Sequence, residues 1–171
     1  MAQLGGSSYL DLALEFARQG ADVALHYKHS QKGAMSAVEE ITSPGRRATA
    51  FQANFDCLEE ATALANQAMD FLGGIDCLVN NTGITMNKPF LNVTREQFDR
   101  LIHVNTRSPF FVAQRIVQHM IEHAEGAIVN LTSIHGLQGA PEHSVYAATK
   151  GAIISLYPHA GYRTGIQGSP V

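Results

Sequence analysis

A tyrosine and a lysine stand four positions apart in the segment YAATKGAIISL, at Tyr146 and Lys150. On a helix, residues at this spacing lie one above the other on the same face. A tyrosine hydroxyl is a poor acid–base catalyst at neutral pH, and a neighbouring ammonium favours its phenolate form. The pair can therefore give a proton to a carbonyl oxygen, or take one from an alcohol.

Two further polar residues could serve the same reaction. Ser133 precedes Tyr146 at the predicted end of a strand, where its hydroxyl could hydrogen-bond the same substrate oxygen. Asn105, in a predicted helix, could hold a water that relays the proton to solvent. These residues handle protons but carry no electrons, so a hydride would have to come from a cofactor.

The elements that must position these residues alternate between short apolar runs and longer runs of helical period. The predicted strands are 22–27, 47–53, 75–80 and 126–133, and the predicted helices are 32–42, 57–73, 94–123 and one that begins at Ser144. Thr94 and Gln97 form a predicted capping box, and Pro109 predicts a kink. This alternation predicts an α/β fold with a parallel sheet covered on both faces, which binds ligands at the carboxyl ends of its strands.

Composition predicts one globular domain and excludes some partners. The chain has 171 residues, of which 45% are hydrophobic and 16% charged, with a net charge of −3. Scattered basic residues at this charge argue against nucleic acid and anionic membranes as partners. The apolar runs are too short to span a bilayer, and the start of the chain lacks a signal-peptide core, so a cytoplasmic location is expected. Cys57 and Cys77 fit reduced thiols there.

His119 and His123 have the i, i+4 spacing of a metal-binding pair. The sequence indicates no carboxylate or cysteine placed to complete such a site. We therefore predict no metal, and interpret the pair as a favourable positive charge near a helix C-terminus.

The motifs occur in an order that resembles the short-chain dehydrogenase/reductase family. The segments that carry the resemblance span residues 5 to about 156 and are ALEFARQGADVAL, GGIDCLVNNTGIT, HVNT, IVNLTS and SVYAATKGAI. The resemblance implies a Rossmann-like, doubly wound sheet and an NAD(P)-dependent oxidoreductase that interconverts a ketone and a secondary alcohol. The segment 133–153 is most like reductases that act on 3-oxoacyl chains or sugar-like alcohols. A homo-oligomer built through two long helices is also implied.

The resemblance also implies roles for individual residues. Tyr146 would be the acid/base of a catalytic tetrad, and Lys150 would also hold the nicotinamide ribose; the other two members would be Asn105 and Ser133. The cofactor cleft would be lined by Gly5, Gly6, Ser7, Lys28, Asn54, Asn81, Thr82 and Gly83, with Tyr146 and Lys150. Lys28 follows the second strand of the family order without an acid nearby in sequence, which favours NADP(H) over NAD(H).

The sequence departs from the family pattern at both ends. Gly5 and Gly6 match the opening of the pattern TGxxxGxG, but the later glycines are absent and Tyr9 and Asp11 occupy a shortened loop. Only the letters MAQL precede it to supply a first strand. We therefore expect a single domain over residues 1–156 that is incomplete at both ends. The alternative function is a catalytically inactive, truncated family member with weak or no nucleotide binding.

Residues 157–171, which follow the Tyr-Lys helix, are predicted to be an aberrant or disordered tail. Pro158 and the polar residues around it suit no element of such a fold. The codons that can encode this tail, read with the first base dropped, permit TRTLAIELASKG. That string continues a helix and ends in a stop signal. The hypothesis is a one-base shift of the coding frame at about Leu156.

Overall fold

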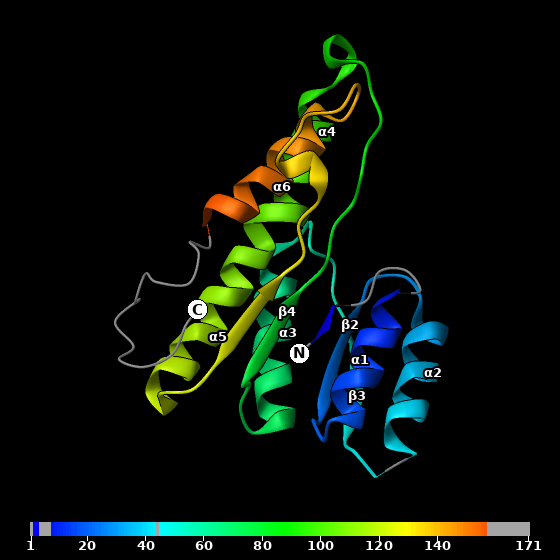
Figure 1. Ribbon diagram of the computed structural model, residues 1–171, viewed down its shortest axis with the longest axis vertical. Helices are drawn as coiled ribbons and strands as arrows, with labels where there is room; N and C mark the ends of the chain where they lie inside the picture. Colours follow the sequence, from blue (N-terminus) through cyan, green and yellow to red (C-terminus); the bar gives the residue numbers. More distant parts are fainter. Residues whose placement is uncertain (1, 4–7, 44, 157–171) are drawn as a thin grey trace.

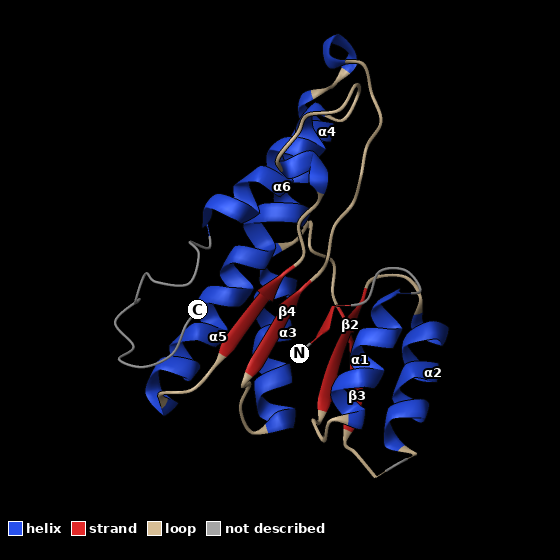
Figure 2. Cartoon of the chain, in the orientation of Figure 1, coloured by secondary structure: helices blue, strands red, loops and turns tan. Residues whose placement is uncertain are grey.

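The computed structural model describes residues 2–3, 8–43 and 45–156 (Figures 1 and 2). Two predictions lie outside the described residues. One is the placement of Gly5, Gly6 and Ser7 in the cofactor loop, and the other is the tail 157–171.

Five parallel strands form one sheet in the order β3-β2-β1-β4-β5, which confirms the predicted doubly wound architecture. The strands are β1 (Ala2–Gln3), β2 (Val23–Tyr27), β3 (Ala48–Gln52), β4 (Cys77–Asn80) and β5 (Ala127–Asn130). The short strand β1 takes the central position, where Ala2 pairs with Leu25 on one side and with Val79 on the other. The start of the chain, which had only four residues to offer for a first strand, thus supplies the two-residue strand β1.

Helices cover both faces of the sheet. They are α1 (Ser8–Arg18), α2 (Gln31–Thr42), α3 (Leu58–Leu72), α4 (Arg95–Ile102), α5 (Ser108–His123) and α6 (Ser144–Leu156), with short 3-10 turns η1 (Phe90–Asn92) and η3 (Ile134–Gly136). Along β2, Val23 and Leu25 pack with α1 and α2, whereas Ala24 packs with α3 and α5. Successive side chains of a strand point to opposite faces, so this alternation separates two apolar cores.

The predicted long helix 94–123 is divided by a π-helical turn, η2 (His103–Arg107). The capping box of Thr94 and Gln97 begins α4 as predicted. Pro109 lies in the first turn of α5, where a missing N–H costs little, and the irregular turn comes just before it. The interruption of the α-helix therefore coincides with Asn105, which lies inside η2 and is fully buried.

At the other end of α5, the carboxylate of Glu122 lies beside the imidazoles of His119 and His123. The expectation that no carboxylate could complete a site with these two histidines is therefore wrong. Their helical spacing of three and four residues places all three groups on one face.

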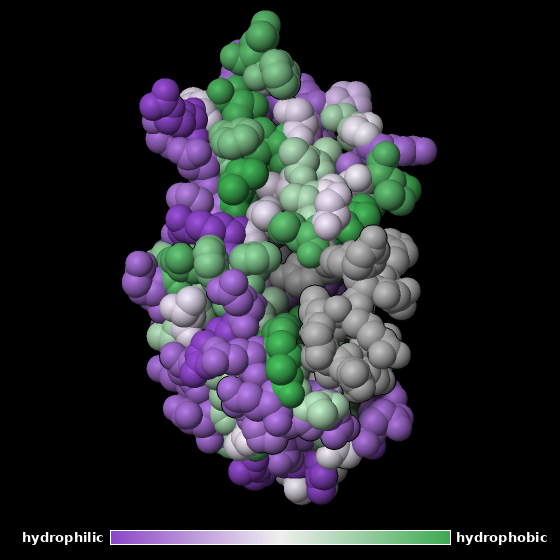
Figure 3. Space-filling model, turned by 90° about the vertical axis from the view of Figure 1, so that its left-hand side faces the viewer, coloured by the Kyte–Doolittle hydropathy of each residue, from purple (hydrophilic) through white to green (hydrophobic). Residues whose placement is uncertain are grey.

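The surface divides by polarity. Figure 3 shows apolar side chains gathered over the upper part of the face that it presents, and polar side chains over much of the lower part. The most exposed large apolar side chains belong to η1 and to the region of η3, and are Phe90, Leu91, Ile134 and Leu137. None of the described helices has the length and apolar character needed to cross a membrane.

Candidate active site

Tyr146 and Lys150 lie on one face of α6, as their spacing predicts. The Nζ atom of Lys150 is 6.0 Å from the centre of the Tyr146 ring. Nζ also donates a hydrogen bond to the backbone oxygen of Leu131, just after β5, at 2.9 Å. Lys150 is only 5% exposed, and this burial lowers its pKa because removing water disfavours the charged form. The lysine is thus held between the sheet edge and the tyrosine.

A pocket of about 220 Å³ opens beside this pair. Its walls come from the carboxyl ends of β4 and β5 and from α6, and its lining residues are Asn81, Gly83, Ile84, Thr85, Leu131, Thr132, Tyr146 and Lys150. The predicted residues Asn81, Gly83, Tyr146 and Lys150 are therefore brought together. This is the edge at which parallel sheets bind their ligands.

Asn105 connects this edge of the sheet to α6. Its Oδ1 accepts from the backbone N–H of Ile84 at 2.8 Å, and its Nδ2 donates to the Ile84 carbonyl at 2.9 Å and to Thr149 Oγ1 at 3.0 Å. Thr149 in turn donates to the Tyr146 carbonyl at 2.7 Å. Both amide protons of Asn105 are thereby used in hydrogen bonds that join the loop after β4 to α6. Its role in a water relay stays a prediction.

Ser133 lies at the start of η3, which packs against α6. Its hydroxyl oxygen accepts from the His135 backbone N–H at 3.2 Å, which leaves the hydroxyl proton available for donation. Ser133 is not among the described lining residues of the pocket beside Tyr146. Its catalytic role also stays a prediction.

Two histidines flank Tyr146, and neither was predicted from the sequence. The rings of His135 and His143 lie 6.1 Å and 6.3 Å from the Tyr146 ring, edge to face, and 5.1 Å from each other. His135 comes from η3 and His143 from the loop before α6, so no local spacing signals that they meet.

A second pocket, of about 530 Å³, adjoins the first, because Gly83 and Ile84 line both. Of the predicted cofactor residues, Lys28, Thr82 and Gly83 line it. The sequence analysis missed other lining residues, among them His26, Phe55 and Arg100. They come from different elements, and no motif at any of these positions indicates a shared site.

Lys28 is not beside an acid in sequence, but the fold brings one to it. Its Nζ lies 3.0 Å from Oδ2 of Asp56, in the loop after β3, and Arg100 lies 3.5 Å from the same oxygen. The sequence near Lys28 contains no acid, as noted above, but the folded chain supplies one from another element. Because Asp56 is 28 residues away along the chain, only the pairing of β2 with β3 reveals the contact.

His26 forms an aromatic wall of the second pocket. Its ring stacks on Phe55 at 4.4 Å, and its Nε2 lies 2.9 Å from the Ala53 carbonyl. Burial lowers the pKa of His26, since the imidazolium would lose its hydration. With 3% and 1% of their surfaces exposed, His26 and Phe55 support this wall from within the core.

Asn54 is placed differently from the other predicted cofactor residues. Its Oδ1 accepts from the Asp56 backbone N–H at 3.1 Å, and its own N–H donates to Glu60 at 2.7 Å. It is not among the described lining residues of the second pocket. Contact between Asn54 and an adenine stays a prediction.

Residues 10–163 match the family model described as short chain dehydrogenase. The hydroxynaphthalene reductase arp2 of Aspergillus fumigatus is 37% identical over 142 residues, which are 83% of this chain and 51% of that protein. The 3-oxoacyl-[acyl-carrier-protein] reductase FabG of Staphylococcus epidermidis is 34% identical over 160 residues, 94% of this chain and 66% of that protein. The chain thus spans about half to two-thirds of the length of these curated relatives.

Solved structures give the same result. Acetoin dehydrogenase YohF of Salmonella typhimurium superposes with a TM-score of 0.87 at 28% identity, covering 91% of this chain and 66% of that one. A blue fluorescent protein from a metagenomic library, solved in complex with NADPH, gives 0.82 at 32% identity, covering 91% and 64%. The chain belongs to the short-chain dehydrogenase family and has its Rossmann-like fold.

Proposed function

We propose that this member of the short-chain dehydrogenase family catalyses the NAD(P)(H)-dependent interconversion of a small ketone and a secondary alcohol. The observation that carries the proposal is the placement of a buried Lys150 ammonium beside the Tyr146 ring, in a pocket at the carboxyl ends of β4 and β5. A tyrosine beside a buried lysine, at the end of a parallel sheet where ligands bind, suits proton transfer to or from a substrate oxygen.

The residues of the two adjoining pockets fit a dinucleotide. Lys28 and Arg100 offer cations for phosphate, and the buried pair of His26 and Phe55 backs the wall of the same pocket. Gly83, shared by both pockets, would let the ligand pass from this region to Lys150. When bound, the nicotinamide supplies the hydride that reduces the carbonyl carbon, or accepts it in the reverse direction.

The protein's own part in the reduction is to deliver a proton. Tyr146 gives its hydroxyl proton to the substrate oxygen, which becomes the alcohol, and the Lys150 ammonium stabilises the phenolate that remains. Ser133 would donate a hydrogen bond to the same oxygen. The phenolate then regains a proton from solvent, and the reverse reaction runs through the same groups.

NADP(H) is the proposed cofactor, because Lys28 and Arg100 lie together at one pocket and can both meet a 2′-phosphate. The substrate is proposed to be a small carbonyl compound, in keeping with the reductases that the chain resembles. A homo-oligomer remains an inference from the family, and a cytoplasmic location an inference from the sequence.

The test uses Tyr146→Phe, which removes the ionisable oxygen and leaves the ring. Nicotinamide oxidation with a panel of ketones should fall by about a hundredfold or more, while NADPH binding, followed by fluorescence, is retained. Equal turnover by the wild type and the variant would refute the assignment of Tyr146. If neither NADPH nor NADH binds the wild-type chain, the rival function holds: a catalytically inactive family member.

A further inference from the structure

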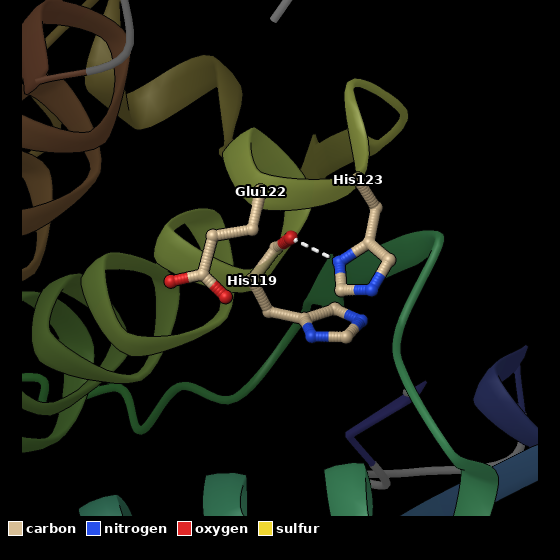
Figure 4. Close-up of side chains that lie close together, drawn as sticks. All are labelled: His119, Glu122 and His123. Atoms are coloured by element: carbon tan, nitrogen blue, oxygen red, sulfur yellow. Dashed lines mark hydrogen bonds between the residues drawn. The ribbon is translucent and has the colours of Figure 1, made fainter.

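The last turn of α5 brings together three groups that ligate metals. Figure 4 shows His119, Glu122 and His123 on the same side of this turn. Each offers one ligand atom, and the three atoms all lie within 4.8 Å of one another. His119 is half-buried, and the other two side chains are exposed. Two histidines at i, i+4 of a helix are a known zinc-chelating arrangement, and here a carboxylate joins them.

The backbone already orients one of the imidazoles. The Nδ1 atom of His123 lies 2.9 Å from the carbonyl oxygen of His119 (Figure 4). A carbonyl can only accept, so Nδ1 carries the proton and the lone pair of the neutral ring resides on Nε2. This is how metal-ligating histidines are commonly fixed by a second hydrogen bond. The His123 ring also lies beside that of His119, with 4.1 Å between their centres.

The loop after α3 leaves space for His119 at this place. A Cβ atom on Gly74 would lie 2.5 Å from Nε2 of His119, so only glycine allows the ring to approach the loop so closely. Asp70 and Glu122 line the adjoining pocket with His119, and they give it negative charge. Arg115 also lines the pocket, but its Nε donates to Asn66 Oδ1 at 2.9 Å, which ties the guanidinium to α3.

From this arrangement we propose that His119, Glu122 and His123 bind one divalent transition-metal ion, with zinc as the preferred physiological ion. In a tetrahedral zinc site the ligand atoms are about 3.4 Å apart, as follows from bond lengths of about 2.0–2.2 Å. Rotation of the exposed Glu122 side chain and small shifts of the two rings can close the remaining gap. Imidazole nitrogens select zinc, copper or nickel over magnesium and calcium, which prefer sites made of oxygen atoms alone. Water would complete the coordination.

The site is structural and separate from the proposed reaction. α5 ends just before β5 begins, so these residues lie at the amino ends of the strands, whereas Tyr146 and Lys150 lie at the carboxyl ends. An ion bound here would link three side chains of the last turn of α5 and so stabilise that turn. Because the three ligands converge only on the folded helix, zinc should stabilise the folded chain by mass action.

The experiment is zinc titration of the full chain, prepared without a polyhistidine tag and stripped with a chelator, by calorimetry. We expect one equivalent to bind and the melting temperature to rise. Loss of a ligand should weaken binding by about tenfold or more in His119→Ala and His123→Ala, and less in Glu122→Gln. The matched controls are His29→Ala, an exposed histidine at the opposite edge of the sheet, and Glu125→Gln, an exposed acid just beyond the helix.

Cobalt provides a second readout, because its visible absorption reports coordination directly. A tetrahedral spectrum that appears in the wild type and the two controls, and is lost in His119→Ala/His123→Ala, supports the proposal. The proposal is wrong if the wild type takes up no zinc, or if the double variant binds zinc as well as the wild type does. Neither result depends on turnover or on nicotinamide binding, so the proposed function is tested separately.

Discussion

Asp56 controls the cations that line the proposed phosphate end of the cofactor pocket. Its carboxylate lies 3.0 Å from Lys28 and 3.5 Å from Arg100. In Asp56→Asn both cations lose a competing anionic partner and can bind a 2′-phosphate more tightly than in the wild type. We expect NADPH affinity to rise by about threefold to tenfold while NADH affinity changes little, as measured by fluorescence titration at low salt.

The control for this variant is Asp99→Asn, which removes an exposed acid from α4. An equal gain for NADH and NADPH would show that the carboxylate acts on the dinucleotide as a whole. That result would contradict a 2′-phosphate site at Lys28.

His26 makes stability depend on pH in a direction fixed by its burial. Its pKa in the folded chain is lowered below the ordinary value of 6.5. Well above pH 6.5 the ring is neutral in both states and contributes nothing to the pH dependence. As the pH falls below that value, the unfolded chain gains a proton that the folded chain does not, so the free energy of unfolding decreases.

The wild-type melting temperature should therefore fall more steeply between pH 7 and pH 5 than that of His26→Asn. His29→Asn serves as the control, because His29 is exposed and should leave the steep fall unchanged. Parallel curves for the wild type and His26→Asn would show that His26 is not the titrating group.

At the level of elements, the pattern of apolar residues predicted most of the sheet. The predicted strand 22–27 is β2 and 47–53 is β3, to within one residue at each end. The period of the apolar residues and the turn residues at the ends of a segment can be read within a short stretch of sequence. These strands could be predicted because they depend on such local signals. The π-helical turn and the contact of Asp56 with Lys28 depend on tertiary packing, so no window of sequence contains them.

The candidate site divides in the same way. The spacing of Tyr146 and Lys150 predicted their shared face, because a helix converts spacing into proximity. The histidines that flank Tyr146 and the carboxylate beside His119 and His123 were missed. For His135 and His143 the cause is that they come from different elements. For Glu122 the signal was present, since a residue three positions from His119 shares its face.

Close packing of η3 on α6 positions the tyrosine helix. A Cβ atom on Gly136 would lie 2.8 Å from the backbone carbon of Lys150 and 2.9 Å from its backbone oxygen. Gly136→Ala should therefore push the two elements apart, at a cost of about 1–3 kcal/mol in stability, and lower the turnover rate with it. Gly139→Ala is the matched control, since nothing lies within 4 Å of its Cβ position, and it should change stability by less than about 0.5 kcal/mol. Equal melting temperatures for the two variants would disprove this packing role.

On the scale of the whole molecule, the two proposed sites lie at opposite ends of the strands. The carboxyl ends of β4 and β5 carry the Tyr146 pocket, and the opposite end carries the proposed metal site. Among the described residues, the central strand β1 supplies two, Ala2 and Gln3, to the ladder between β2 and β4. Among the described elements, α3 contacts β2 and β3 on one side and α5 on the other, so the packing of α3 helps to hold the two halves together.

The last prediction concerns the sequence that follows α6. A chain in which residues 157–168 are replaced by TRTLAIELASKG should extend this helix beyond Leu156. The replacement has no proline inside the helix and places leucines at 160 and 164, which continue the stripe of the buried Ile153. Additional buried apolar surface on α6 should raise the melting temperature by several degrees, and far-UV circular dichroism should show more helix. A replacement of the same composition in scrambled order is the control, since it keeps the residues but loses the stripe. If the scrambled chain melts at the same temperature as the designed one, the shifted-frame segment has no structural relation to this helix, and the frame-shift hypothesis loses its support.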